Sequence, residues 1–133
     1  MAEHLARQYA ILRGRKVEVN SASVLGLVDT PAHKHAIKVC EEIGLDLADH
    51  RSKPVHPELM AWADHVLCME INHAAVLRER FPDFDEKLLL LGSFAGVVEI
   101  EDPLGGWRGR FRQCRDQIKT CVERFIDAMP EPD

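Results

Sequence analysis

The residues best placed for chemistry lie in a loop near the end of the chain, just before a long helical pattern. Segment 101–106 reads E-D-P-L-G-G. Proline disfavours helical backbone in the residue before it, so Pro103 should hold Asp102 extended, and Gly105 and Gly106 allow a sharp turn. A carboxylate held in this way over a cleft can act as a general acid. Taken alone, this segment favours the simpler interpretation, an Asp-Pro turn that leads into a helix.

The sequence offers no credible nucleophile to work with such an acid. A reactive cysteine needs a lowered thiol pKa, commonly from a helix N-terminus or nearby cations. None of the cysteines belongs to a C-x-x-C pair, and none is followed six positions later by arginine, the spacing with which a tight loop could wrap and bind a phosphate. We expect all of them to be reduced thiols packed in the core. They are Cys40, Cys68, Cys114 and Cys121.

The seven histidines form no recognisable metal-binding pattern. His33 and His35 are two positions apart, which would point them to different sides of a helix. The others are scattered, without the H-E-x-x-H or Cys/His spacing that closes a tetrahedral site. The sequence therefore predicts no metal and no cofactor.

Apolar periodicity predicts helices and strands in alternation along the chain. Helices are expected over residues 1–12, 30–43, 57–61, 72–80 and 107–129. Strands are expected over residues 16–21, 64–69 and 87–91, with 97–100 as a candidate edge strand. The two apolar runs at 64–69 and 87–91 are typical of strands buried on both faces. This alternation predicts an α/β fold with three layers, in which helices cover both faces of a parallel sheet.

Two features lead us to expect that a strand is missing from these residues. Three or four strands make a thin sheet for so many helices. The first helix, with Leu5, Tyr9 and Leu12 on one stripe, has no N-cap, strand or loop ahead of it. In parallel α/β domains the loop from the first strand into the first helix often binds phosphate. We therefore expect that a strand and a loop of this kind belong ahead of Met1.

Composition favours a single globular domain. The 133 residues are 46% hydrophobic, so we predict one domain over 1–129 and a frayed, proline-rich tail over 130–133. A net charge of -5 without long Lys/Arg runs argues against nucleic-acid binding. Neither a membrane-length apolar run nor a secretory signal is present, so we expect a cytoplasmic protein.

In order and spacing, these segments resemble the low-molecular-weight protein tyrosine phosphatases, whose fold is shared with bacterial protein arginine phosphatases and one class of arsenate reductases. The resemblance extends over residues 1–129, and its specificity comes from the order of motifs that are individually weak. The matching segments are 1–3 (M-A-E, which follows the family's C-x-G-N-x-C-R-S-P phosphate loop), 19–23 (V-N-S-A-S for V-x-S-A-G), 30–36, 44–47, 50–53, 63–69 (A-D-H-V-L-C-M for F-D-L-I-L-V-M) and 102–103.

The resemblance implies cysteine-dependent hydrolysis of phosphate esters without a cofactor. In the family a loop cysteine attacks phosphorus, the loop arginine and backbone N–H groups hold the phosphoryl oxygens, and an aspartate protonates the leaving oxygen. Only the last role carries over, to Asp102, with Pro103, Gly105 and Gly106 positioning its loop. The D-P-L-G-G form is similar to the D-P-F-G-G of the arginine-phosphatase-like bacterial branch. The arsenate reductase branch is disfavoured, because residues 88–101 contain no resolving cysteine.

Two functional hypotheses follow from the resemblance. The first is a phosphatase, of phosphotyrosine or phosphoarginine, whose true start lies upstream, so that residues 1–133 alone are inactive. The alternative is a non-catalytic pseudophosphatase or a module that binds phosphorylated partners. The implied partner is a phosphorylated protein or a small phosphate ester. Without a central strand, the strands around Val17 and Val66 would expose unpaired backbone, so we also expect self-association through these edges.

Overall fold

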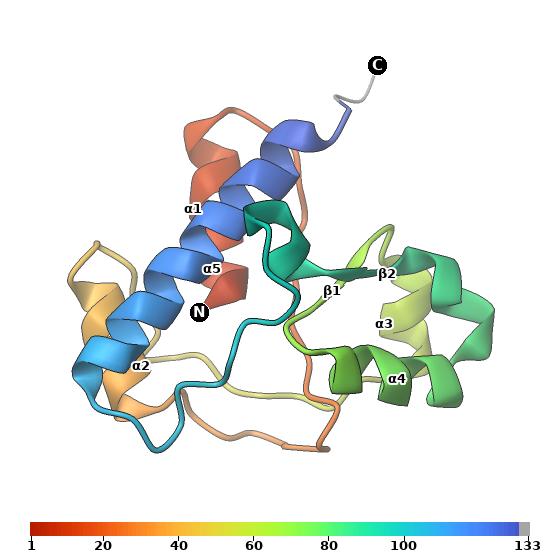
Figure 1. Ribbon diagram of the computed structural model, residues 1–133, viewed down its shortest axis with the longest axis horizontal. Helices are drawn as coiled ribbons and strands as arrows, with labels where there is room; N and C mark the ends of the chain where they lie inside the picture. The colour runs from red at the N-terminus through yellow and green to blue at the C-terminus, as the bar shows by residue number, and fades with distance from the viewer. Residues whose placement is uncertain (131–133) are drawn as a thin grey trace.

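Two short parallel strands lie at the centre of the structure, a computed structural model that describes residues 1–130 (Figure 1). Strand β1 (Val66–Cys68) leads through helix α4 (Ile71–Arg80) and the 3₁₀ helix η1 (Pro82–Lys87) into strand β2 (Leu88–Leu90). The strands pair in parallel with the register Val66–Leu88, Leu67–Leu89 and Cys68–Leu90. Both predicted apolar strands and their parallel direction are therefore confirmed, in shorter form.

The other helices lie close to their predicted positions, with one shifted start. They are α1 (Ala2–Leu12), α2 (Lys34–Glu41), α3 (Pro57–Trp62) and α5 (Arg108–Ala128), and a second 3₁₀ helix, η2 (Leu91–Ala95), follows β2. Helix α2 begins after the predicted Thr30-Pro31, because Pro31 pairs with Arg51 in an isolated bridge and the His33 ring accepts the His35 N–H as a cap (3.1 Å).

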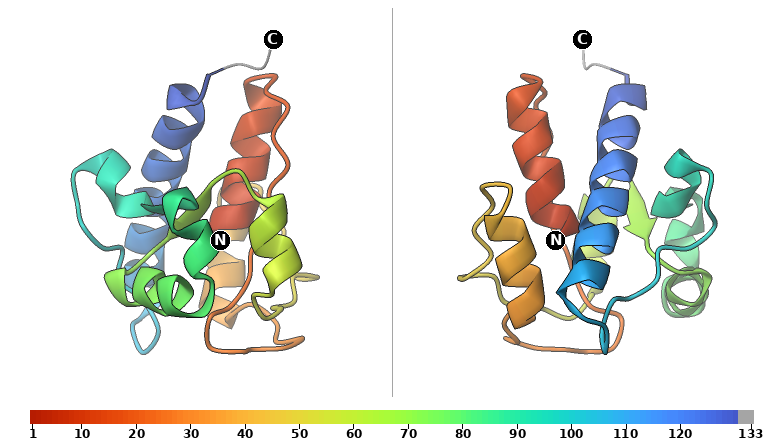
Figure 2. Two further views of the ribbon diagram at one scale, coloured as in Figure 1. Left: turned by 90° about the vertical axis from the view of Figure 1, so that its right-hand side faces the viewer. Right: turned by 60° about the vertical axis from the view of Figure 1, so that its left-hand side comes forward.

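Alternating side chains of β1 fill two cores on opposite faces of the sheet. Leu67 packs into a cluster built from α1, α2 and α5, which includes Leu5, Val39 and Ile118. Val66 and Cys68 pack instead into a cluster built from α3 and α4. The ribbon shows α1, α2 and α5 on one side of the strands and α3 and α4 on the other (Figure 1), and α1 and α5 lie side by side in both views of Figure 2. Helices therefore cover both faces of a small parallel sheet, which has two strands within residues 1–130.

The predicted strand at residues 16–21 is wrong as a sheet strand. Its burial still alternates, with Val17 and Val19 half-buried and the residues between them exposed. Among the described residues, however, the sheet contains β1 and β2 alone, so this segment has no ladder partner. Side-chain contacts hold it instead, such as the hydrogen bond from Arg7 Nη2 to Val19 O (2.9 Å). The candidate edge strand at 97–100 is also not formed.

Two further points concern the predicted tail and the possibility of a membrane-spanning helix. The frayed tail predicted at 130–133 lies, from residue 131 onwards, outside the described residues. Over residues 1–130, no helix combines the length and the apolar character needed to cross a bilayer.

Helix α5 is fixed to its neighbours by arginines. Arg115, 8% exposed, donates to Val39 O (2.7 Å) and to the Glu42 carboxylate (2.8 Å) beyond the end of α2. Arg112 binds the same carboxylate through two nitrogens (2.7 and 2.9 Å). At the other end of α5, Arg15 donates to the carbonyls of Ile126 (3.0 Å) and Met129 (2.7 Å), in the region where helix carbonyls run out of i+4 partners.

The Glu42 ion pairs should make stability depend on pH in the acid range. The hydrogen bond from Arg112 lowers the pKa of the Glu42 carboxyl from 4.5 to about 2, with Arg115 adding to it. Because the folded-state pKa is depressed, this stabilisation is present above pH 4.5 and is lost as pH falls towards 2. We predict that Glu42→Gln lowers the melting temperature at pH 7 by about 5 °C. The difference from the unsubstituted chain should shrink as the pH falls from 4.5 towards 2.

Glu41→Gln is the matched control, because Glu41 makes only a long ion pair with Lys38 (3.8 Å) on the surface. It should leave the melting temperature unchanged. Equal melting temperatures for Glu42→Gln and the unsubstituted chain at pH 7 would contradict the assignment.

Self-association of residues 1–133 is also predicted. Within the described residues each strand pairs only with the other, so both outer edges present unpaired backbone. Sedimentation velocity over a concentration series should show dimers or larger species. Leu89→Lys, which places a charge on the half-exposed middle of β2, should shift the population towards monomer. A sharply melting monomer at every concentration would argue against open edges.

Candidate active site

Asp102 is held at the tip of a structured turn. Its Oδ1 accepts a hydrogen bond from the Leu104 N–H (2.9 Å), and the Gly106 N–H donates to Pro103 O (2.9 Å). Gly105 has a φ of +85°, which glycine adopts without strain. Pro103 is buried and anchors the turn, whereas the Asp102 side chain is exposed. Oδ1 is therefore engaged, whereas Oδ2 makes no hydrogen bond to any residue within 1–130 and can meet a ligand.

One backbone hydrogen bond attaches this loop to the end of β1, and one side-chain hydrogen bond attaches it to the start of α4. The Ile100 N–H donates to Met69 O (2.9 Å), and the Ile100 side chain is 2% exposed. The Glu99 carboxylate accepts the Ile71 N–H (2.9 Å) and so caps the start of α4. The loop is thereby held at the carboxyl end of a parallel strand, the edge at which α/β folds commonly bind ligands.

A groove of about 270 Å³ lies between this loop, the end of β1 and the start of α1. Helix α1 has no side-chain cap, and the first backbone N–H groups of any helix lack partners within it. The partial positive charge there favours anions. The groove is lined by Met1, Ala2, Glu3, Ser21, Met69, Glu70, His73, Ile100, Glu101, Asp102, Pro103, Cys114 and Ile118. It therefore combines an exposed carboxylate with a helix N-terminus suited to phosphate.

None of the cysteines is activated. Cys114 reaches the groove, where its Sγ lies 3.8 Å from Glu101 O, but burial raises the pKa of its thiol. Burial likewise raises the pKa of Cys40, Cys68 and Cys121. All four are buried and free, so the prediction of reduced core thiols is confirmed. The sequence also contains no cysteine with an arginine six positions later.

Several groove residues were not singled out by their spacing in the sequence. His73 Nε2 lies 3.4 Å from Glu70 Oε1, and Ser21 is hydrogen-bonded to Glu3. Glu3 and Ser21 belong to segments 1–3 and 19–23, which match motifs of the family. Nothing in the sequence shows that these two segments contact each other. His33 and His35 lie elsewhere, packed against the Phe111 ring at centroid distances of 4.9 and 5.3 Å.

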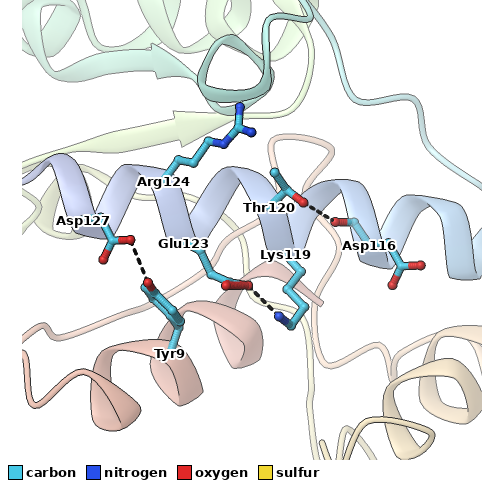
Figure 3. A pocket seen from close by; sticks show the side chains of 7 residues that line it. All are labelled: Tyr9, Asp116, Lys119, Thr120, Glu123, Arg124 and Asp127. Atoms are coloured by element: carbon cyan, nitrogen blue, oxygen red, sulfur yellow. Dashed lines mark hydrogen bonds and ion pairs between the residues drawn. The ribbon is translucent and has the colours of Figure 1, made fainter.

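A second hollow, of about 460 Å³, lies between α1 and α5 (Figure 3). Its side chains are largely paired with one another. Tyr9 donates to Asp127 (2.7 Å), Lys119 contacts Glu123 (2.6 Å), and Thr120 donates to the Asp116 carbonyl (3.1 Å). These pairs account for the polar groups without a ligand, so the groove beside Asp102 is the better candidate.

The sequence matches the family described as "Low molecular weight phosphotyrosine protein phosphatase" over residues 1–132. It is 36% identical over 115 residues to a protein-arginine-phosphatase of Geobacillus stearothermophilus, covering 85% of this chain and 77% of the relative. It is 32% identical over 128 residues to the low molecular weight protein-tyrosine-phosphatase Wzb of Escherichia coli, covering 96% of this chain and 84% of Wzb.

The fold is similar to that of a solved variant of the YwlE arginine phosphatase. That variant carries serine in place of cysteine and has a phosphorylated active-site serine. The TM-score is 0.90 with 29% identity, and the match covers 95% of this chain and 84% of the other.

The turn around Asp102 should depend on Gly106 and not on Gly109. A Cβ on Gly106 would lie 2.7 Å from Arg110 Cδ and 3.0 Å from Pro103 O, so Gly106→Ala must move the Arg110 side chain and crowd the Pro103 carbonyl of the turn. We expect it to lower the free energy of unfolding by about 1–3 kcal/mol. Gly109→Ala meets nothing within 4 Å and lies in α5, so it should be neutral or stabilise by about 0.5–1 kcal/mol. Equal effects of the two substitutions in chemical denaturation would contradict this packing.

Proposed function

Because the chain belongs to the low molecular weight phosphotyrosine protein phosphatase family, we propose that Asp102 is the general acid of a reaction that hydrolyses phosphorylated substrates in the adjoining groove. Members of this family bind phosphorylated substrates. The observation that carries the proposal is the exposed Asp102 carboxylate, held by its turn at the mouth of a groove that begins at the N-terminus of α1.

The chemistry follows from the bonds that change. A thiolate attacks phosphorus, an S–P bond forms, and the bond from phosphorus to the leaving group breaks. Asp102 gives its proton to the leaving atom, an oxygen in phosphotyrosine or a nitrogen in phosphoarginine. In the second step Asp102 takes a proton from water as the water attacks phosphorus, and the thiolate leaves. The phosphorylated serine of the related YwlE variant supports a phosphoryl group carried on the nucleophile.

We favour phosphoarginine over phosphotyrosine as the substrate. The D-P-L-G-G turn of residues 102–106 is similar to the form found in the arginine-phosphatase-like branch. The higher identity to the Geobacillus protein-arginine-phosphatase, 36% against 32% for Wzb, points the same way.

Residues 1–133 supply the scaffold and the acid but neither the thiolate nor its paired arginine. The free cysteines are buried thiols with raised pKa values, and none has the spacing of a phosphate-binding loop. We therefore expect these residues by themselves to have no hydrolytic activity. A non-catalytic module that binds phosphorylated partners is the second candidate, favoured by this same observation.

Adding a nucleophile loop should generate activity. A strand and a phosphate loop of the form C-x-G-N-x-C-R-S-P, which the family resemblance implies, would be fused ahead of Met1. We predict that the fusion hydrolyses phenyl phosphate and phosphoarginine, whereas residues 1–133 alone do not. Replacing the grafted nucleophilic cysteine by serine is the control. Activity of the unfused chain that is abolished by Cys68→Ser would overturn the proposal, and an inactive but folded fusion would favour the binding module.

Within an active fusion, Asp102→Asn should lower kcat for phenyl phosphate by about 10²–10⁴-fold, because the amide cannot donate the proton. Asp83→Asn is the matched control, since Asp83 is exposed in η1 and does not line the groove. It should leave kcat unchanged. Full activity of Asp102→Asn would exclude the general-acid role.

A further inference from the structure

Two histidines and a glutamate meet beside the first turn of α1. Glu3 and His4 come from the helix, and His50 comes from the loop that follows α2. One ligand atom from each lies within 4.8 Å of the other two. The His4 and His50 rings are 5.2 Å apart, edge to face. All three side chains are half-buried, so the cluster is partly shielded from solvent and is not an exposed acidic surface.

One atom of this cluster lacks a partner. His4 Nδ1 is buried and makes no hydrogen bond to any residue that the structure describes. A buried polar atom left unpaired is unfavourable by about 1–3 kcal/mol. An ion bound between the two rings would satisfy such a nitrogen.

Imidazole nitrogens and a carboxylate oxygen are donor groups that bind metal ions. Neighbouring side chains already orient the carboxylate. The Ser21 hydroxyl donates to Glu3 Oε1, and Arg7 Nη2 donates to Glu3 Oε2 (2.8 Å) and to Val19 O (2.9 Å). Each carboxylate oxygen has a second lone pair available, so these bonds can coexist with a metal ligand. Outer contacts of this kind commonly fix the ligands of metal sites.

We propose that Glu3, His4 and His50 bind one divalent transition-metal ion, with Zn²⁺ as the best fit. Two imidazole nitrogens and one carboxylate oxygen form a donor set used by zinc, which leaves a fourth position for water. Ca²⁺ and Mg²⁺ prefer oxygen ligands and fit less well. At bond lengths of about 2.0–2.1 Å, tetrahedral ligand atoms lie about 3.4 Å apart, so small side-chain rotations close the site.

The ion would join the start of α1 to the loop after α2. The site shares Glu3 with the groove, but Asp102 is not a ligand and neither His4 nor His50 lines the groove, so metal binding can be tested apart from hydrolysis. Sequence spacing predicted no metal site, since the ligands come from segments that are distant in the sequence.

Calorimetric titration of residues 1–133 with Zn²⁺ tests the proposal. We expect one ion per chain, with affinity weakened at least about tenfold by His4→Gln and by His50→Gln. His65→Gln, at an exposed histidine outside the cluster, should leave the affinity unchanged. Circular dichroism of each variant confirms folding. No binding by the unsubstituted chain, or equal binding by all variants, would overturn the site.

A second measurement on the unsubstituted chain does not require the variants to fold. Side-chain nitrogen resonances of the histidines, followed by NMR during Zn²⁺ addition, should move for His4 and His50 and stay in place for His56, His65 and His73. With Co²⁺, the absence of a thiolate-to-cobalt charge-transfer band should exclude the cysteines as ligands. Shifts confined to other histidines, or a thiolate band, would contradict the assignment.

Discussion

The hydrogen bond from the Ile100 N–H to Met69 O fixes where the candidate active site can be. Its net contribution to stability is only about 1 kcal/mol, but it joins the loop that carries Asp102 to the end of β1. The buried Ile100 side chain and the Glu99 cap on α4 hold the same junction. The Asp102 turn is therefore placed against the sheet edge, with the start of α1 across the groove.

A sheet of two short strands offers little surface to position the segments around the groove. Packing between the helices therefore supplies most of that positioning. Helix α5 packs against α1, α2 and η2 and supplies much of the larger core. Its polar contacts complete the layer, because Arg115 and Arg112 share the Glu42 carboxylate, and Arg15 satisfies carbonyls at the end of α5. These bonds keep α1 and α2 in position beside the groove and beside the histidine cluster.

Sequence reasoning succeeded where the signal was local. The continuous apolar runs predicted β1 and β2, and the stripe through Phe111, Cys114 and Ile118 predicted α5. These patterns are reliable because they depend only on which residues of the same segment are buried. It failed at residues 16–21, since a strand also needs a partner that periodicity cannot show. The start of α2 was missed because the Pro31–Arg51 bridge is non-local. The Asp-Pro motif identified Asp102, whereas only the structure shows its turn and its groove.

We propose that Asp102 donates the proton to the leaving group. The most direct test is the dependence of kcat on leaving-group pKa, measured with a series of aryl phosphates for the chain fused to a nucleophile loop and for the same fusion with Asp102→Asn. A general acid neutralises the charge that develops on the leaving oxygen. We predict a shallow dependence of kcat on leaving-group pKa with Asp102 present and a steep one after the substitution. Equal slopes would contradict it.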